Sequence, residues 1–181
     1  MMQKFLLLLV IVSAIPTHIQ SQENRIEGEI IKDFGQTFPV SNPEVTTDTG
    51  ATLKVIFDVA KSSEDKSLPN KNIVTAARFL NMHANQGMSL DQLKVAITIH
   101  GSAWQDVLNN ATYKEKFGVD NPNLKLINQL NAAGVDVIIC GQTAAYRNMP
   151  RENVNKNVKF ALSAMTALLQ YQNKGYHLIN F

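Results

Sequence analysis

Residues 134–149 read GVDVIICGQTAAYRNM, and this stretch decides how the chain folds. Its apolar, β-branched run ends on Cys140, the only cysteine of the sequence, and lies between Gly134 and a Gly-Gln-Thr turn. A short apolar run between turn residues predicts a strand that is buried on both faces, as in a parallel sheet. Because open parallel sheets carry their sites just beyond the carboxyl ends of such strands, Cys140 is the first candidate for a reactive group.

Outward from this strand, apolar patterns of strand type and helix type alternate along the chain. Further strands are expected at Leu53–Val59, Leu93–Gly101, Val158–Leu162 and Tyr176–Phe181. Helices are expected at Asn72–Gln86, Trp104–Asn109, Tyr113–Phe117, Asn123–Ala133 and Ser163–Asn173, with a helical turn from Thr143. This alternation predicts parallel crossover units, and therefore a three-layer α/β/α sandwich.

The length and composition are those of one folded domain. The chain has 181 residues, 45% of them hydrophobic, and a formal net charge of +2. Such a content is ample for a core, and the charge, with no Lys/Arg cluster, predicts no nucleic-acid partner. A single cysteine excludes an internal disulfide, so Cys140 is a packed thiol, a reactive thiol or half of an intermolecular bridge.

Residues 1–21 have the anatomy of a secretory signal peptide. Lys4 precedes an apolar run over residues 5–15, which Pro16 and a polar tail follow. The run is well short of the ~20 residues that a membrane-spanning helix needs. We therefore expect cleavage before Gln22 and an exported mature protein without a membrane segment, periplasmic if the source is a Gram-negative bacterium.

The mature chain divides into an arm and a domain. Residues 22–50 mix Gly and Pro with scattered apolar side chains, which predicts an irregular N-terminal arm before an α/β domain at residues 51–181. The apolar residues of the arm are expected to pack onto the domain or onto a neighbouring subunit. These residues are Ile26, Ile30, Ile31, Phe34 and Phe38.

Three residues are candidates for chemistry at the carboxyl edge of the sheet. A thiol reacts as the thiolate, and the pKa of Cys140 would fall beside a helix N-terminus or a cation. His100 ends the preceding strand pattern, and Arg147 follows Cys140 by about two helical turns. Two alternatives stay open: an inert, packed Cys140, and a His100 that only hydrogen-bonds to the neighbouring loop.

Other signatures are absent from the sequence. No Gly-x-Gly-x-x-Gly follows the first strand, and neither a Walker loop nor a Gly-x-Ser-x-Gly elbow occurs. His83 and His177 have no ligand partner at short spacing, so no metal and no cofactor are predicted. Trp104 could form the wall of a ligand pocket, or belong to the core or a subunit interface.

From about Thr52 to Phe181 the chain resembles the DsrE/DsrF-like family of sulfur-relay and intracellular sulfur-oxidation proteins. The resemblance rests on the first strand, on the Val95–Gly101 strand end, on the cysteine segment with Ala144, Ala145 and Arg147, and on the closing segments Phe160–Ala164 and Gly175–Phe181. It implies a five-stranded, mainly parallel sheet of order 4-3-2-1-5 with helices on both faces, and assembly into trimers or hexamers. In the relay members the cysteine accepts sulfur as a persulfide and passes it to a partner protein.

Three hypotheses follow. In the first, an exported DsrE-like sulfur carrier binds or transfers sulfane sulfur through Cys140, with a sulfur donor or acceptor protein as partner. The backbone N–H groups of Gly141 and Gln142 would stabilise the anion, and His100 or Arg147 would favour its charged form. The second is a non-catalytic homo-oligomeric binding or assembly module with a structural Cys140. The third is a small-molecule pocket at subunit interfaces that uses Trp104 and Tyr146.

Overall fold

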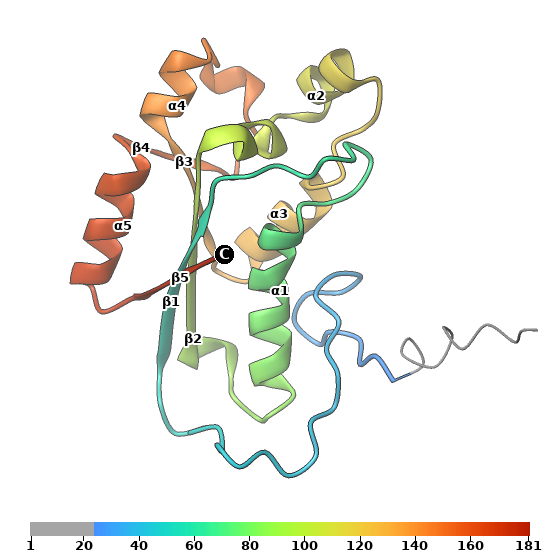
Figure 1. Ribbon diagram of the computed structural model, residues 1–181, viewed down its shortest axis with the longest axis vertical. Coiled ribbons are helices and arrows are strands. Elements are labelled where there is room, and N and C mark those ends of the chain that lie inside the picture. Colours follow the sequence, from blue (N-terminus) through green and yellow to red (C-terminus); the bar gives the residue numbers. More distant parts are fainter. Residues whose placement is uncertain (1–23) are drawn as a thin grey trace, which may run out of the picture.

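The structure, a computed structural model, describes residues 24–181 of the chain (Figure 1). The segment predicted to be a signal peptide therefore lies outside the described residues. Within residues 24–181, no helix combines the length and the apolar character that crossing a membrane requires.

Five strands form one sheet in the order β4-β3-β2-β1-β5. The strands are β1 (Leu53–Val59), β2 (Leu93–Ile99), β3 (Asp136–Cys140), β4 (Lys159–Ala161) and β5 (His177–Asn180). Every neighbouring pair runs parallel. The predicted fold class and strand order are confirmed, and the sheet is parallel throughout.

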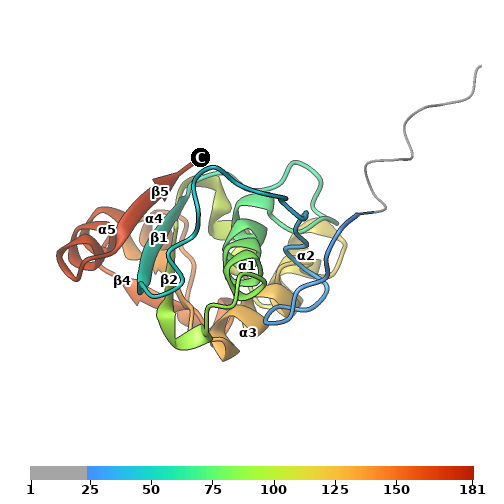
Figure 2. The same cartoon turned by 90° about the horizontal axis from the view of Figure 1, so that it is seen from below.

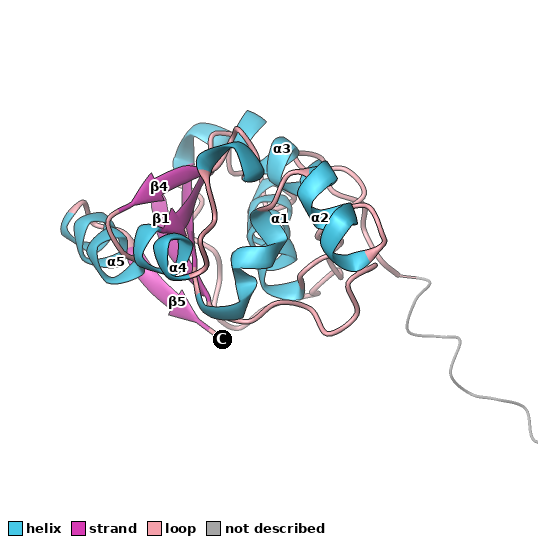
Figure 3. Cartoon of the chain, turned by 90° about the horizontal axis from the view of Figure 1, so that it is seen from above, coloured by secondary structure: helices cyan, strands magenta, loops and turns pink. Residues whose placement is uncertain are grey.

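Helices cover the two faces and the carboxyl edge of the sheet. Helices α1 (Lys71–Ala84) and α3 (Leu124–Ala132) lie on one side of the strands and α5 (Ala164–Asn173) on the other (Figure 2). Seen from above, α4 (Gly141–Tyr146) lies over the carboxyl ends of the strands, with α2 (Asn110–Phe117) farther out (Figure 3). Short 3-10 helices occupy Leu90–Gln92, Gly101–Val107 and Arg151–Asn153.

The alternation of side chains along the strands gives the sheet two buried faces. One face joins α1 and α3 in the main core through Val55, Phe57, Val59, Val95, Ile97, Ile99, Val137 and Ile139. The residues between them, Ile56, Ala96, Ile138 and Cys140, are also buried but stand outside that cluster. They occupy the opposite face, where α5 packs across β1, β2 and β3, so Cys140 points to the α5 side.

Two element boundaries differ from the prediction in a way that affects the site. Strand β2 ends at Ile99, because Gly101 turns the chain with a φ of +54° and starts a 3-10 helix at Gly101–Val107, upstream of the helix predicted at Trp104–Asn109. Helix α4 begins at Gly141 and not at Thr143, which makes Cys140 its N-cap residue.

The arm over residues 24–50 is irregular, with one antiparallel bridge between Ile26 and Thr37. Of its apolar side chains, Ile31 is fully buried in the core, and Ile30 and Phe34 pack against it. Ile26 and Phe38 are exposed. Three of the five apolar residues thus pack onto this domain.

A half-buried carboxylate ties the start of β3 to β4 and to α5. Asp136 accepts hydrogen bonds from the Lys159 ammonium and the Tyr171 hydroxyl. Burial raises the pKa of Asp136, but these two hydrogen bonds and the charges of Lys159 and Lys174 lower it by more, so the pKa lies below its usual value. Because the carboxyl is more acidic in the folded state, its contribution to stability is present above pH ~4 and is lost as pH falls through the folded-state pKa.

We expect Asp136→Asn to lower the free energy of unfolding at pH 7 by about 1–2 kcal/mol, because hydrogen bonds to a charged acceptor become weaker neutral ones. Urea unfolding at pH 7 and at successively lower pH should show a shallower acid loss of stability than in the wild type. Asp120→Asn is the matched control, since Asp120 pairs with Lys114 in solvent. Equal acid sensitivity of Asp136→Asn and the wild type would contradict this role.

Candidate functional site

Cys140 lies where two helices begin. It is the last residue of β3 and the N-cap of α4, and 6% of its surface is exposed. Its Sγ accepts a hydrogen bond from the backbone N–H of Thr143 in α4 at 3.5 Å. The backbone N–H of Gln142, in the same turn of α4, also lowers the pKa of the thiol. The backbone N–H of Ala164, the first residue of α5, lowers the pKa of the thiol as well. The positive ends of two helices therefore converge on one sulfur atom.

These contacts change the acidity of the thiol. Burial raises the pKa of Cys140, but the Thr143 hydroxyl and the N–H groups of Thr143, Ala164 and Gln142 lower it by more. The pKa of Cys140 consequently lies below the usual value of a thiol. Since the thiolate is the nucleophile, the site favours the reactive form of the sulfur.

The two predicted anion-stabilising residues have different roles. Gln142 contacts the sulfur through its backbone N–H. Gly141 is not among the donors to Sγ; it lies against β4, where a Cβ atom would be 2.5 Å from the Ala161 oxygen and 3.1 Å from the Leu162 oxygen. The absence of a side chain at Gly141 lets α4 start close to β4.

His100 ends beside the cysteine, together with a carboxylate that sequence reasoning missed. Ile99 and Ile139 are register partners, so His100 and Cys140 leave adjacent parallel strands, which run ~4.8 Å apart, at the same level. His100 Nε2 lies 3.0 Å from Asp58 Oδ1. Both atoms are buried, and their contact does not have the geometry of a hydrogen bond. Neither atom has a hydrogen-bond partner within residues 24–181.

The register places these polar groups on one face of the sheet. Asp58 pairs with Thr98, and His100 follows Thr98 by two residues, so all three point to the side on which Cys140 lies. Thr98 Oγ1 is buried and likewise has no hydrogen-bond partner among the described residues. The carboxyl edge on the α5 side therefore combines a thiol, an imidazole, a carboxylate and a hydroxyl.

The structure does not bring Arg147 to the sulfur. Arg147 caps the C-terminal end of α4, a rise of ~10 Å along the helix from Cys140. Its guanidinium lies 5.2 Å from the ring centroid of Tyr146. It lines a separate cavity with Trp104, which does not include Cys140 or His100.

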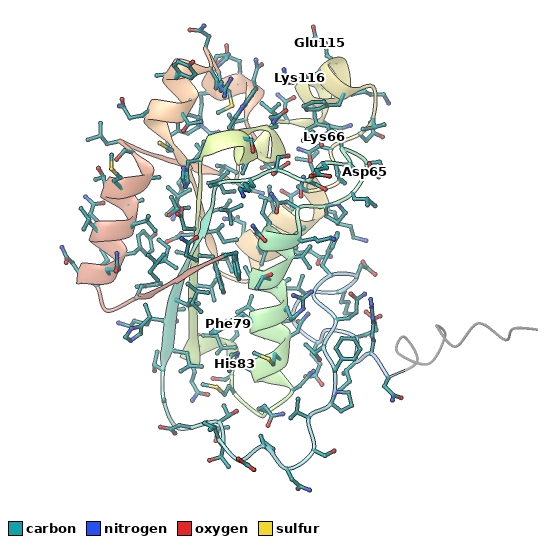
Figure 4. The ribbon with its side chains drawn as sticks, viewed as in Figure 1. Asp65, Lys66, Phe79, His83, Glu115 and Lys116 are labelled. Atoms are coloured by element: carbon teal, nitrogen blue, oxygen red, sulfur yellow. The ribbon has the colours of Figure 1, made fainter. Side chains whose placement is uncertain are left out.

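The described residues offer no metal centre. Within residues 24–181, no three His, Cys, Asp or Glu side chains are arranged to hold a metal ion. His83 lies on α1 beside Phe79, where its Nδ1 is 2.7 Å from the Phe79 carbonyl oxygen (Figure 4). His177 is exposed on β5.

Comparisons with known proteins agree with this architecture. The model of the DsrE/DsrF-like family matches residues 54–181. Two solved structures are similar: MTH1491, a protein of unknown function from Methanobacterium thermoautotrophicum, and the ychN protein from E. coli. Each is 14% identical with a TM-score of 0.54, and each alignment covers 71% of this chain and 99% of the other. At that identity the likeness shows the fold alone. No curated protein matches the chain.

Proposed function

Because the chain belongs to the DsrE/DsrF-like family over residues 54–181, we propose that it is a sulfur carrier that holds sulfane sulfur as a persulfide on Cys140. The observation that supports this proposal most directly is the set of donors around Sγ. Three backbone N–H groups and the Thr143 hydroxyl lower the pKa of the thiol. A thiolate, and equally a persulfide anion, is the species that such donors favour.

The proposed transfer is an exchange without net oxidation. The Cys140 thiolate attacks the outer sulfur of a donor hydropersulfide, the donor S–S bond breaks, and the donor leaves as its thiolate. Cys140 then carries the hydropersulfide. An acceptor thiolate attacks the outer sulfur in turn, and Cys140 is released as the thiolate.

His100 would accept the proton of the Cys140 thiol before the attack. The carboxylate of Asp58, 3.0 Å from Nε2, would stabilise the resulting imidazolium. The low exposure of Cys140 favours a small donor such as polysulfide for loading. A thiol of a partner protein is the acceptor in this proposal.

The test is intact-mass spectrometry after treatment with polysulfide. The wild type should gain the mass of one sulfur atom, which a thiol reductant removes, and Cys140→Ser should gain none. Thr143→Val keeps the side-chain shape and removes one donor to the sulfur, so its thiol pKa should rise and iodoacetamide should label it several-fold more slowly at neutral pH. A wild-type thiol that iodoacetamide labels but polysulfide leaves unmodified would refute the carrier function.

A second candidate is a non-catalytic homo-oligomeric module. Large apolar side chains are exposed on and beside β4, α5 and β5, at Phe160, Leu162, Met165, Leu169, Leu178 and Phe181. Exposed apolar groups of this kind are typical of subunit interfaces. This function would be favoured over sulfur transfer by two results together: the chain sediments as an oligomer, and Cys140 is labelled only at the rate of global unfolding.

Export from Gln22 is also part of the proposal. N-terminal sequencing of the protein from the extracytoplasmic fraction of cells that express the full chain tests it. A protein that keeps residues 1–21 in the soluble cytoplasmic fraction would contradict export.

A further inference from the structure

A cavity of about 320 Å³ lies at the carboxyl edge of the sheet, apart from the thiol. Trp104 contributes one wall from the 3-10 helix at Gly101–Val107, and Lys116 contributes another from α2. The opposite side comes from the segment after α4, with Arg147 and Met149. Its volume is in the range of pockets that bind small organic molecules.

Backbone hydrogen bonds hold the two sides of this cavity together. Leu108, which lines the cavity, forms an antiparallel bridge with Val154. On either side of the bridge, the Asn109 N–H donates to the Asn153 oxygen at 2.7 Å, and the Asn155 N–H donates to the Val107 oxygen at 2.8 Å. Main-chain hydrogen bonds thus join the segment that carries Leu108 to the segment that carries Asn153, both of which line the cavity.

The lining combines an apolar floor with positive charge. Leu108 and Met149 are buried apolar residues. The Lys116 ammonium lies 5.5 Å from the Trp104 ring centroid, and Arg147 supplies a second cation. Within residues 24–181 neither cation forms an ion pair with a carboxylate.

The one acidic residue of the lining does not cancel this charge. Glu115 and Lys116 lie on the last turn of α2, and Glu115 is at the outer tip of the helix (Figure 4). Two cations against one carboxylate leave the cavity positive. The Lys116 ammonium lies over the Trp104 indole, so a ligand ring can pack against Trp104 beside that cation.

We propose that this cavity binds a small organic anion that carries a flat ring, of the aromatic carboxylate class. The ring occupies the space over Leu108 and Met149 beside Trp104, and Lys116 and Arg147 pair with the carboxylate. This site is independent of the persulfide chemistry, because Cys140 does not line the cavity.

Trp104 makes the proposal directly testable, because it is the only tryptophan of the chain and gives one indole N–H resonance. The probes are 2-naphthoate and 2-naphthamide, which share the ring and differ in charge. In ¹H–¹⁵N correlation spectra, 2-naphthoate should shift the Trp104 indole resonance saturably, with a dissociation constant roughly tenfold lower than that of 2-naphthamide.

The double variant Lys116→Gln/Arg147→Gln should lose this roughly tenfold preference for the anion, with the rest of its spectrum unchanged. Lys94→Gln is the matched control, since Lys94 is exposed on β2 outside the cavity. Cys140→Ser should bind 2-naphthoate as the wild type does, whatever the outcome of the polysulfide experiment.

Three results would overturn the proposal. The first is equal affinity for the two probes, which would remove the role of the cations. The second is no saturable shift of the Trp104 indole up to the solubility limit of 2-naphthoate. The third is shifts confined to α5 and β5, which would show adsorption to the exposed apolar side chains there.

Discussion

Asn81→Leu should detach the N-terminal arm from the domain and lower the free energy of unfolding by about 3–5 kcal/mol. Asn81 is fully buried on α1, where its Oδ1 accepts from the Ile31 N–H at 2.9 Å. Its Nδ2 donates to the carbonyl oxygens of Ile31, Phe34 and Gly35, at 3.0, 3.0 and 3.2 Å. Leucine has a similar volume but leaves these backbone groups without partners, and each costs ~1–3 kcal/mol when buried.

Urea unfolding measures the loss of stability, and amide hydrogen exchange locates it. The Ile31 amide should exchange far faster in the variant, while the amides of β2 should follow global stability. Arg78→Gln is the control, because the hydrogen bond that its side chain donates to the same arm, to the Gln36 oxygen at 3.4 Å, is exposed. A protected Ile31 amide in Asn81→Leu would mean that apolar packing alone holds the arm.

Asn81 illustrates what the sequence could not show. The helical period of Ile73, Ala76, Ala77 and Leu80 identifies the face of α1 that packs on the sheet, but Asn81 faces the arm. A polar residue beside an apolar stripe is usually solvated. Its partners lie at least 46 positions earlier, in a segment without any periodicity.

The strands were predictable because each is a short apolar run between turn residues, and the order of the sheet came from the family resemblance. Cys140 and His100 were predictable site candidates for the same reason, since each marks the end of such a run. Asp58 and Ala164 were not predictable as site residues. They lie on β1 and α5, and only the order of the strands in the sheet brings these elements beside the end of β3. Arg147 was expected near the sulfur because it follows Cys140 by seven residues. Helix α4 begins at Gly141, so Arg147 lies at the opposite end of this helix from Cys140.

Among substitutions that leave Cys140 and the residues that donate to its Sγ unchanged, we expect Gly141→Ala to disturb the thiol site most. The added Cβ would lie 2.5 Å from the Ala161 oxygen and 3.1 Å from the Leu162 oxygen. Both are backbone atoms, so they cannot move aside as a flexible side chain would. Either β4 must separate from β3 or the first turn of α4 must shift, at a cost of about 1–3 kcal/mol.

A shifted α4 withdraws the N–H groups of Gln142 and Thr143 from Sγ, which raises the pKa of the Cys140 thiol. The rate of iodoacetamide labelling as a function of pH measures this directly, and its midpoint should move to higher pH in Gly141→Ala. Gly50→Ala is the matched control: its Cβ would meet only the Asp48 Oδ1, at 3.3 Å on an exposed turn, so stability and labelling should equal those of the wild type. If Gly141→Ala is destabilised but the midpoint of its labelling curve is unchanged, then β4 has moved and α4 has kept its position beside Sγ. The acidity of Cys140 would then depend on α4 and α5, without any contribution from the edge strand β4.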